Sequence, residues 1–131
     1  MALSLESQIV KLGFIEEQQT ILDRPFPLVL IPADSKVNFV DLQEYFQSNH
    51  QNILKAASLY GAVLFKGFDI QNGEEWASVL YTSGLKEMNY VGGAAVRKLI
   101  VGTEGKIEDM QILTTNESPP SEPIPFHHEL A

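Results

Sequence analysis

The pattern of apolar and polar positions predicts a chain of mixed helices and strands. Residues 25–33, PFPLVLIPA, form a short apolar run bounded by prolines, which is typical of a strand near the edge of a sheet. Residues 61–68, GAVLFKGF, predict a second, buried strand. Two later runs, RKLIVGT and DMQILTTNE, predict strands on either side of a glycine-containing turn region, TEGK.

Helical spacing occurs between these runs. Over residues 38–60, apolar side chains recur at intervals of three and four, as on one face of a helix. The polar stretch QSNHQN interrupts this pattern, so the sequence predicts either two helices or one interrupted helix, with Gly61 as the stop. The predicted fold class is therefore α+β, with helices early in the chain and strands late.

A further helix is predicted over the segment NGEEWASVLYTSG. Asn72 can cap it, and Glu75 follows three residues later as in a capping box. The same spacing assigns Trp76 to the core. We interpret Asp69, Glu74 and Glu75 as loop and capping residues rather than catalytic carboxylates.

Composition narrows the class of protein. The chain has 131 residues, of which 44% are apolar and 20% charged, which suits one globular domain over residues 1–131. No apolar run approaches the roughly 18 residues of a membrane span, and the start carries no secretory pattern, so cytoplasmic is the default expectation. The net charge of −8 argues against nucleic acid and anionic membranes as partners. It still allows a small anionic substrate, because one arginine can hold a carboxylate.

The strongest candidate chemistry lies in the segment PIPFHHELA. Four of the eight residues 118–125 are proline, which predicts a loop that delivers FHHELA to a defined place. In a strand, His127 and Glu129 would share one face and His128 would point to the other. An imidazole and a carboxylate on one face are two of the three ligands of the facial triad that holds Fe(II). The alternative is a pair of surface histidines beside a solvated carboxylate.

Three segments together carry a resemblance to a known family. YGAVLFKGFDI, NYVGGAAVRKLI and TTNESPPSEPIPFHHELA occur in that order over roughly residues 59–131. They resemble segments of the taurine dioxygenase-like (TauD/TfdA) Fe(II)/2-oxoglutarate-dependent oxygenases, closest to the clavaminate synthase-like branch. The resemblance implies an incomplete double-stranded β-helix, or jelly roll, of which this chain is the N-terminal portion without the C-terminal half.

The resemblance also implies roles for individual residues. His127 and Glu129 would be iron ligands, with 2-oxoglutarate as co-substrate and a small molecule as substrate. Tyr90, Arg97 and Asn116 fall in segments that line the substrate side in the family. Each has a structural alternative, which is a core aromatic for Tyr90, a surface cation for Arg97 and an Asx-turn for Asn116.

The family pattern sets two further expectations. Family halogenases have alanine or glycine at the carboxylate position, so Glu129 argues against halogenation. The distal histidine and the arginine that pairs with 2-oxoglutarate lie downstream in the family, so we expect no catalytic residue of that half here and no activity from this chain alone. The alternative is a non-catalytic remnant or small interaction module that forms a homo-oligomer through its open sheet.

Overall fold

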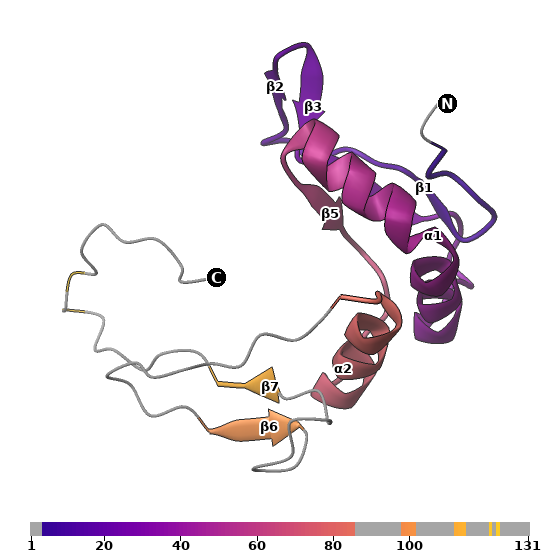
Figure 1. Ribbon diagram of the computed structural model, residues 1–131, viewed down its shortest axis with the longest axis vertical. Coiled ribbons are helices and arrows are strands. Elements are labelled where there is room, and N and C mark those ends of the chain that lie inside the picture. Colours follow the sequence, from indigo (N-terminus) through magenta and orange to yellow (C-terminus); the bar gives the residue numbers. More distant parts are fainter. Residues whose placement is uncertain (1–3, 86–97, 102–111, 115–120, 122, 124–131) are drawn as a thin grey trace. The chain divides into compact units, whose positions relative to one another are not determined.

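The computed structural model describes residues 4–85, 98–101, 112–114, 121 and 123 (Figure 1). These residues form both helices and strands, which confirms the predicted α+β mixture. The chain divides into two units, Met1–Leu85 and Lys86–Ala131. The jelly roll and the single domain over residues 1–131 stay predictions.

The first unit contains a three-stranded sheet. Its order is β1 (Val10–Leu12), β4 (Leu28–Pro32) and β5 (Val63–Phe65). β4 pairs antiparallel with β1 and parallel with β5, so it is the central strand, and the expectation of an edge strand is wrong. The prolines are compatible with this position, because Pro25 and Pro27 precede β4 and Pro32 is its last residue. The strand positions between Pro27 and Pro32 keep their N–H groups for the ladder.

The order of elements also differs from the prediction. β1 to β4 all precede the first helix, so the expectation of helices early and strands late is wrong. β1, β2 and β3 each have three residues, which is too short to show a period of two in the sequence.

A separate hairpin precedes β4. β2 (Gln19–Ile21) and β3 (Arg24–Phe26) pair antiparallel and form their own two-stranded sheet. The two residues of the turn, Leu22 and Asp23, have φ angles of 51° and 61°. Positive φ at both central positions is the pattern of a type I′ turn, whose twist matches that of the flanking strands.

One long helix, α1 (Phe39–Tyr60), follows β4. The Asn38 side chain accepts from Val40 N and Asp41 N, and the Asp41 side chain accepts from Asn38 N, which completes a capping box. Gly61 ends the helix with a φ of 81°, as predicted. The polar stretch QSNHQN lies inside this helix, so the option of two helices is wrong.

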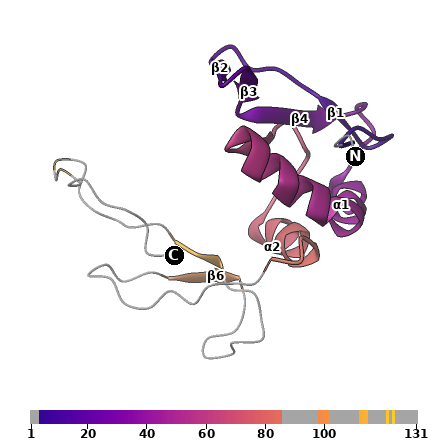
Figure 2. The same ribbon diagram turned by 45° about the horizontal axis from the view of Figure 1, so that its top comes forward.

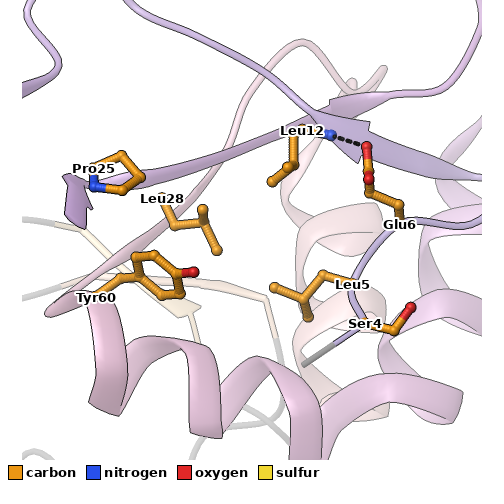
Figure 3. A pocket seen from close by; sticks show the side chains of 7 residues that line it. All are labelled: Ser4, Leu5, Glu6, Leu12, Pro25, Leu28 and Tyr60. Atoms are coloured by element: carbon orange, nitrogen blue, oxygen red, sulfur yellow. Dashed lines mark hydrogen bonds between the residues drawn. The ribbon is translucent and has the colours of Figure 1, made fainter. Parts of the chain in front are cut away.

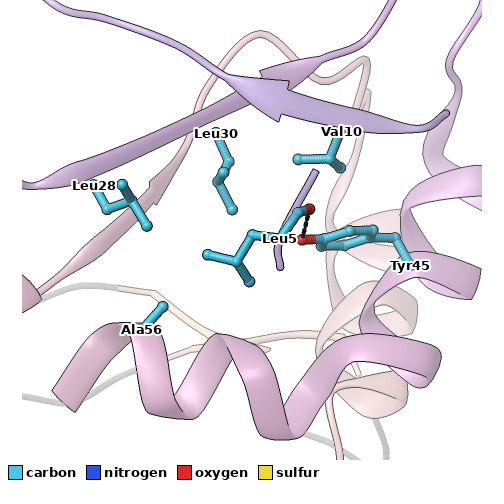
Figure 4. Close-up of a cluster of buried hydrophobic side chains, with 6 residues drawn as sticks. All are labelled: Leu5, Val10, Leu28, Leu30, Tyr45 and Ala56. Atoms are coloured by element: carbon cyan, nitrogen blue, oxygen red, sulfur yellow. Dashed lines mark hydrogen bonds between the residues drawn. The ribbon is translucent and has the colours of Figure 1, made fainter. Parts of the chain in front are cut away.

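The main hydrophobic core of the first unit lies between the sheet and α1. Figure 4 shows its side chains, and the two that α1 supplies, Tyr45 and Ala56, lie on stretches that run in different directions, so the helix bends between them. The buried members are Leu5, Val10, Leu28, Leu30, Tyr45 and Ala56. The ring of Phe65 on β5 lies 6.2 Å from that of Tyr45 and 4.7 Å from that of Phe46. Aromatic contacts therefore attach the edge strand β5 to α1.

A second helix, α2 (Gly73–Thr82), packs against α1 (Figure 2). Asn72 caps it as predicted, since its side chain accepts from Glu75 N at 2.9 Å. Ala77 and Val79 are buried, whereas Trp76 is 45% exposed, so the assignment of Trp76 to the core is wrong. Among the described residues, no helix combines the length and hydrophobicity that a membrane crossing requires.

The second unit contains the predicted late strands in shortened form. β6 (Leu99–Val101) and β7 (Ile112–Leu113) pair antiparallel, with Leu99 opposite Leu113. The turn region TEGK lies outside the described residues, as does most of the proline-rich segment 118–125. The described part of this unit confirms the strand pair.

Candidate functional site

The candidate metal ligands lie outside the part of the chain that the structure describes. His127 and Glu129 fall in that category, and so does the neighbouring His128. The candidate substrate-binding residues Tyr90 and Arg97 lie outside the described residues as well, and Asn116 does too. Their roles therefore stay predictions from the sequence.

The described strands come close in sequence to two of these candidates. Lys98 N donates to Thr114 Oγ1, and Thr114 N donates to Lys98 O, both at 2.9 Å. These bonds extend the β6–β7 pair by one residue on each strand. Arg97 precedes Lys98 directly, and Asn116 is the second residue after Thr114.

The remaining histidine of the chain, His50, lies in α1, where the sequence predicted a helical region. Its Nδ1 lies 3.3 Å from the carbonyl oxygen of Gln47, one turn earlier in the same helix. Within residues 4–85 and the shorter described segments, histidines and carboxylates form no group of three that could hold a metal ion.

Three acidic residues that the sequence analysis assigned to loops and caps lie in such positions. Glu75 Oε2 accepts from Gln71 N at 2.7 Å, just before α2. This is a variant of the predicted capping box, because the carboxylate reaches the residue before the cap rather than the N–H of Asn72. Asp69 Oδ1 accepts a hydrogen bond from the Gln71 side chain. Glu74 lies in the first turn of the helix, where a negative charge is favourable.

The structure contains a pocket of about 410 Å³ in the first unit, which the sequence did not predict (Figure 3). Its lining residues are Ser4, Leu5, Glu6, Leu12, Pro25, Leu28 and Tyr60. They come from the N-terminal segment, β1, β3, β4 and the end of α1. No motif joins positions so far apart in the sequence, so only the fold could reveal the pocket.

Tyr45 attaches the N-terminal segment to α1. Its hydroxyl donates to Leu5 O at 2.6 Å, and the side chain is almost fully buried (Figure 4). Burial disfavours the charged phenolate and raises the pKa of Tyr45 to about 12. Tyr45 therefore stays a neutral hydrogen-bond donor over the physiological pH range and holds Leu5 beside the pocket.

Comparison with known proteins gives one informative similarity. No family model matches the chain. A clavaminate synthase-like protein of Arabidopsis thaliana is 33% identical over 122 residues, which cover 89% of this chain and 34% of that protein. The chain thus spans about a third of the length of the curated relative that it matches. This similarity supports the clavaminate synthase-like part of the predicted resemblance.

Proposed function

We propose that this chain forms part of an Fe(II)/2-oxoglutarate-dependent dioxygenase that oxidises a small molecule by a hydroxylase-type reaction. The observation that carries the proposal is the 33% identity to a clavaminate synthase-like protein over 122 residues. The segments that resemble the taurine dioxygenase-like family belong to the same sequence and agree with this similarity. The chain covers a third of its relative, so the proposed activity belongs to a protein that includes more than these residues.

The donor atoms at residues 127–129 fit the proposed metal. His127 offers an imidazole nitrogen and Glu129 a carboxylate oxygen, and this combination suits Fe(II) in a facial triad. Alternation along a strand would direct both side chains to one face and His128 to the other. Bound Fe(II) would supply the oxidising chemistry together with 2-oxoglutarate and oxygen, while the protein positions the substrate and excludes water.

The proposed substrate contacts are Arg97, Asn116 and Tyr90. If antiparallel pairing continues beyond Lys98 and Thr114, Arg97 would lie opposite Thr115, and alternation would direct the Arg97 and Asn116 side chains to opposite faces. By itself, the Arg97 guanidinium can bind a carboxylate or a similar anion through two hydrogen bonds. Arg97 therefore allows a small anionic substrate despite the net charge of −8.

A metal titration of the 131-residue chain tests the ligand assignment. Co(II) is a suitable paramagnetic probe, because it prefers the same ligands as Fe(II) and binds them more tightly. In NMR spectra of the ¹⁵N-labelled protein, we expect Co(II) to perturb the signals of residues near 127–129 first. His127→Ala should abolish this perturbation.

His128→Ala is the matched control, because it removes an adjacent imidazole that the proposal places on the opposite face. It should leave the Co(II) response intact. The ligand assignment fails if His127→Ala leaves the response unchanged, or if His128→Ala abolishes it instead.

A second candidate function is that of an interaction module. Among the described residues, β1 and β5 are the edge strands of the three-stranded sheet, and an open edge can pair with a strand of another chain. Light scattering at several protein concentrations tests this alternative, which predicts a concentration-dependent dimer or larger assembly.

A further inference from the structure

The pocket of the first unit has walls that hydrogen bonds hold in place. Tyr45 Oη donates to Leu5 O at 2.6 Å and fixes the N-terminal wall to α1. Leu12 N donates to Glu6 Oε1 at 3.2 Å and fixes the same segment to β1 (Figure 3). The first bond joins segments 40 residues apart and the second spans six residues, and together they hold this wall in a preformed position, as is usual for small-molecule sites.

The opposite wall is fastened by a separate bond. Arg24 Nη1 donates to Leu59 O at 2.9 Å, which connects the hairpin strand β3 to the last turn of α1. The positive guanidinium at the end of the helix also complements its dipole. The neighbouring residues Pro25 and Tyr60, which line the pocket, are thereby held relative to each other.

The lining combines an apolar surface with few polar groups. Leu5, Leu12 and Leu28 present alkyl side chains, and the Tyr60 ring lies across from them with its hydroxyl directed toward Leu5 (Figure 3). The one hydrogen bond drawn among these residues uses a single carboxylate oxygen of Glu6. Within the described residues, the second carboxylate oxygen and the Tyr60 hydroxyl can therefore accept hydrogen bonds from a ligand.

We propose that this pocket binds a small organic amine that carries one apolar group. The ammonium would pair with the Glu6 carboxylate, while the apolar group would contact the leucines. The net charge of −8 and the carboxylate at the pocket disfavour an anion of the same size. The site lies in the first unit and its proposal does not depend on the proposed oxygenase function.

Three ligands that share a phenyl ring but differ in charge test the proposal. We would titrate benzylamine, benzyl alcohol and benzoate into the ¹⁵N-labelled 131-residue protein and follow its NMR spectrum. Benzylamine should shift the amide signals of Glu6 and Leu12 saturably at millimolar concentration. Benzyl alcohol should bind about threefold more weakly, as expected for the loss of one exposed ion pair, and benzoate should bind more weakly still.

Two variants locate the binding. Glu6→Gln keeps an oxygen that accepts from Leu12 N but removes the charge, so it should lower the affinity for benzylamine about threefold and leave that for benzyl alcohol unchanged. Glu44→Gln removes an exposed carboxylate of α1 that does not line the pocket, so it should change neither affinity.

Each of four results overturns the proposal. They are the absence of saturable shifts with benzylamine, equal affinity for the three compounds, an equal loss in both variants, and a spectrum without the dispersion of a folded protein. The last result counts because the proposal requires the preformed walls.

Discussion

Tyr45 shows how one residue couples burial, hydrogen bonding and pH. Its hydroxyl satisfies a carbonyl of the N-terminal segment, and its ring contributes to the core. In the folded protein its pKa rises from 10.0 to about 12, because burial disfavours the phenolate. The folded state therefore keeps this proton at a pH where the unfolded chain has lost it.

This linkage predicts a loss of stability at high pH. The raised pKa gives stability that is complete below about pH 10 and is lost as the pH rises toward 12. In Tyr45→Phe, the free energy of unfolding should decrease less between pH 10 and pH 12 than in the wild type. At pH 7 the same variant should have a free energy of unfolding lower by ~1–3 kcal/mol, because Leu5 O loses its hydrogen-bond donor. Urea unfolding at several pH values measures both effects.

Tyr81→Phe is the control, since the Tyr81 side chain is 73% exposed. Tyr81→Phe should have the wild-type free energy of unfolding at pH 7 and the wild-type loss of stability at alkaline pH. An identical alkaline profile for wild type and Tyr45→Phe would contradict the account.

Leu22 has an unfavourable backbone conformation in the β2–β3 turn. Its φ of 51° suits asparagine or glycine far better than leucine, and its side chain is 87% exposed, so burial offers little compensation. We expect Leu22→Asn to raise the free energy of unfolding by ~0.5–1 kcal/mol. Leu22→Ala, whose side chain has no amide group, should raise the free energy of unfolding by less. Equal increases in both variants would contradict the turn argument.

At the scale of elements, the sequence predicts helix ends better than strands. Asn72 and Gly61 mark helix ends because capping is chemistry between near neighbours in the chain. The central position of β4 depends on its pairing with β5, which lies across the whole of α1 in the sequence. The exposure of Trp76 likewise depends on which face α2 turns toward α1. These features are tertiary, so a local pattern could not decide them.

Gly61 offers a test of the end of α1. Its φ is 81°, and an added Cβ would lie 3.0 Å from Phe26 Cε2. Gly61→Ala should therefore lower the free energy of unfolding by ~1–2 kcal/mol. Gly73→Ala, in the first turn of α2 with open space around it, should be neutral or stabilising. Thermal unfolding followed by circular dichroism compares the stabilities of the two variants. Similar losses of stability in both would contradict the argument about the end of α1.

At the scale of the whole molecule, the two candidate sites depend on the sequence in opposite ways. The spacing of His127 and Glu129 indicates metal chemistry because two donors two residues apart share one face of a strand. The pocket has no such signal, because its lining comes from segments that only the fold brings together. The similarity to a clavaminate synthase-like protein supports the family resemblance and tests neither site.

The central claim is that this sequence belongs to an Fe(II)/2-oxoglutarate-dependent dioxygenase whose iron His127 and Glu129 help to hold. The most direct measurement is succinate formation from 2-oxoglutarate by the product of the complete coding frame that contains residues 1–131. The account predicts Fe(II)- and oxygen-dependent succinate that His127→Ala abolishes and His128→Ala preserves. Succinate formation that is absent from the wild type, or unaffected by His127→Ala, would contradict it.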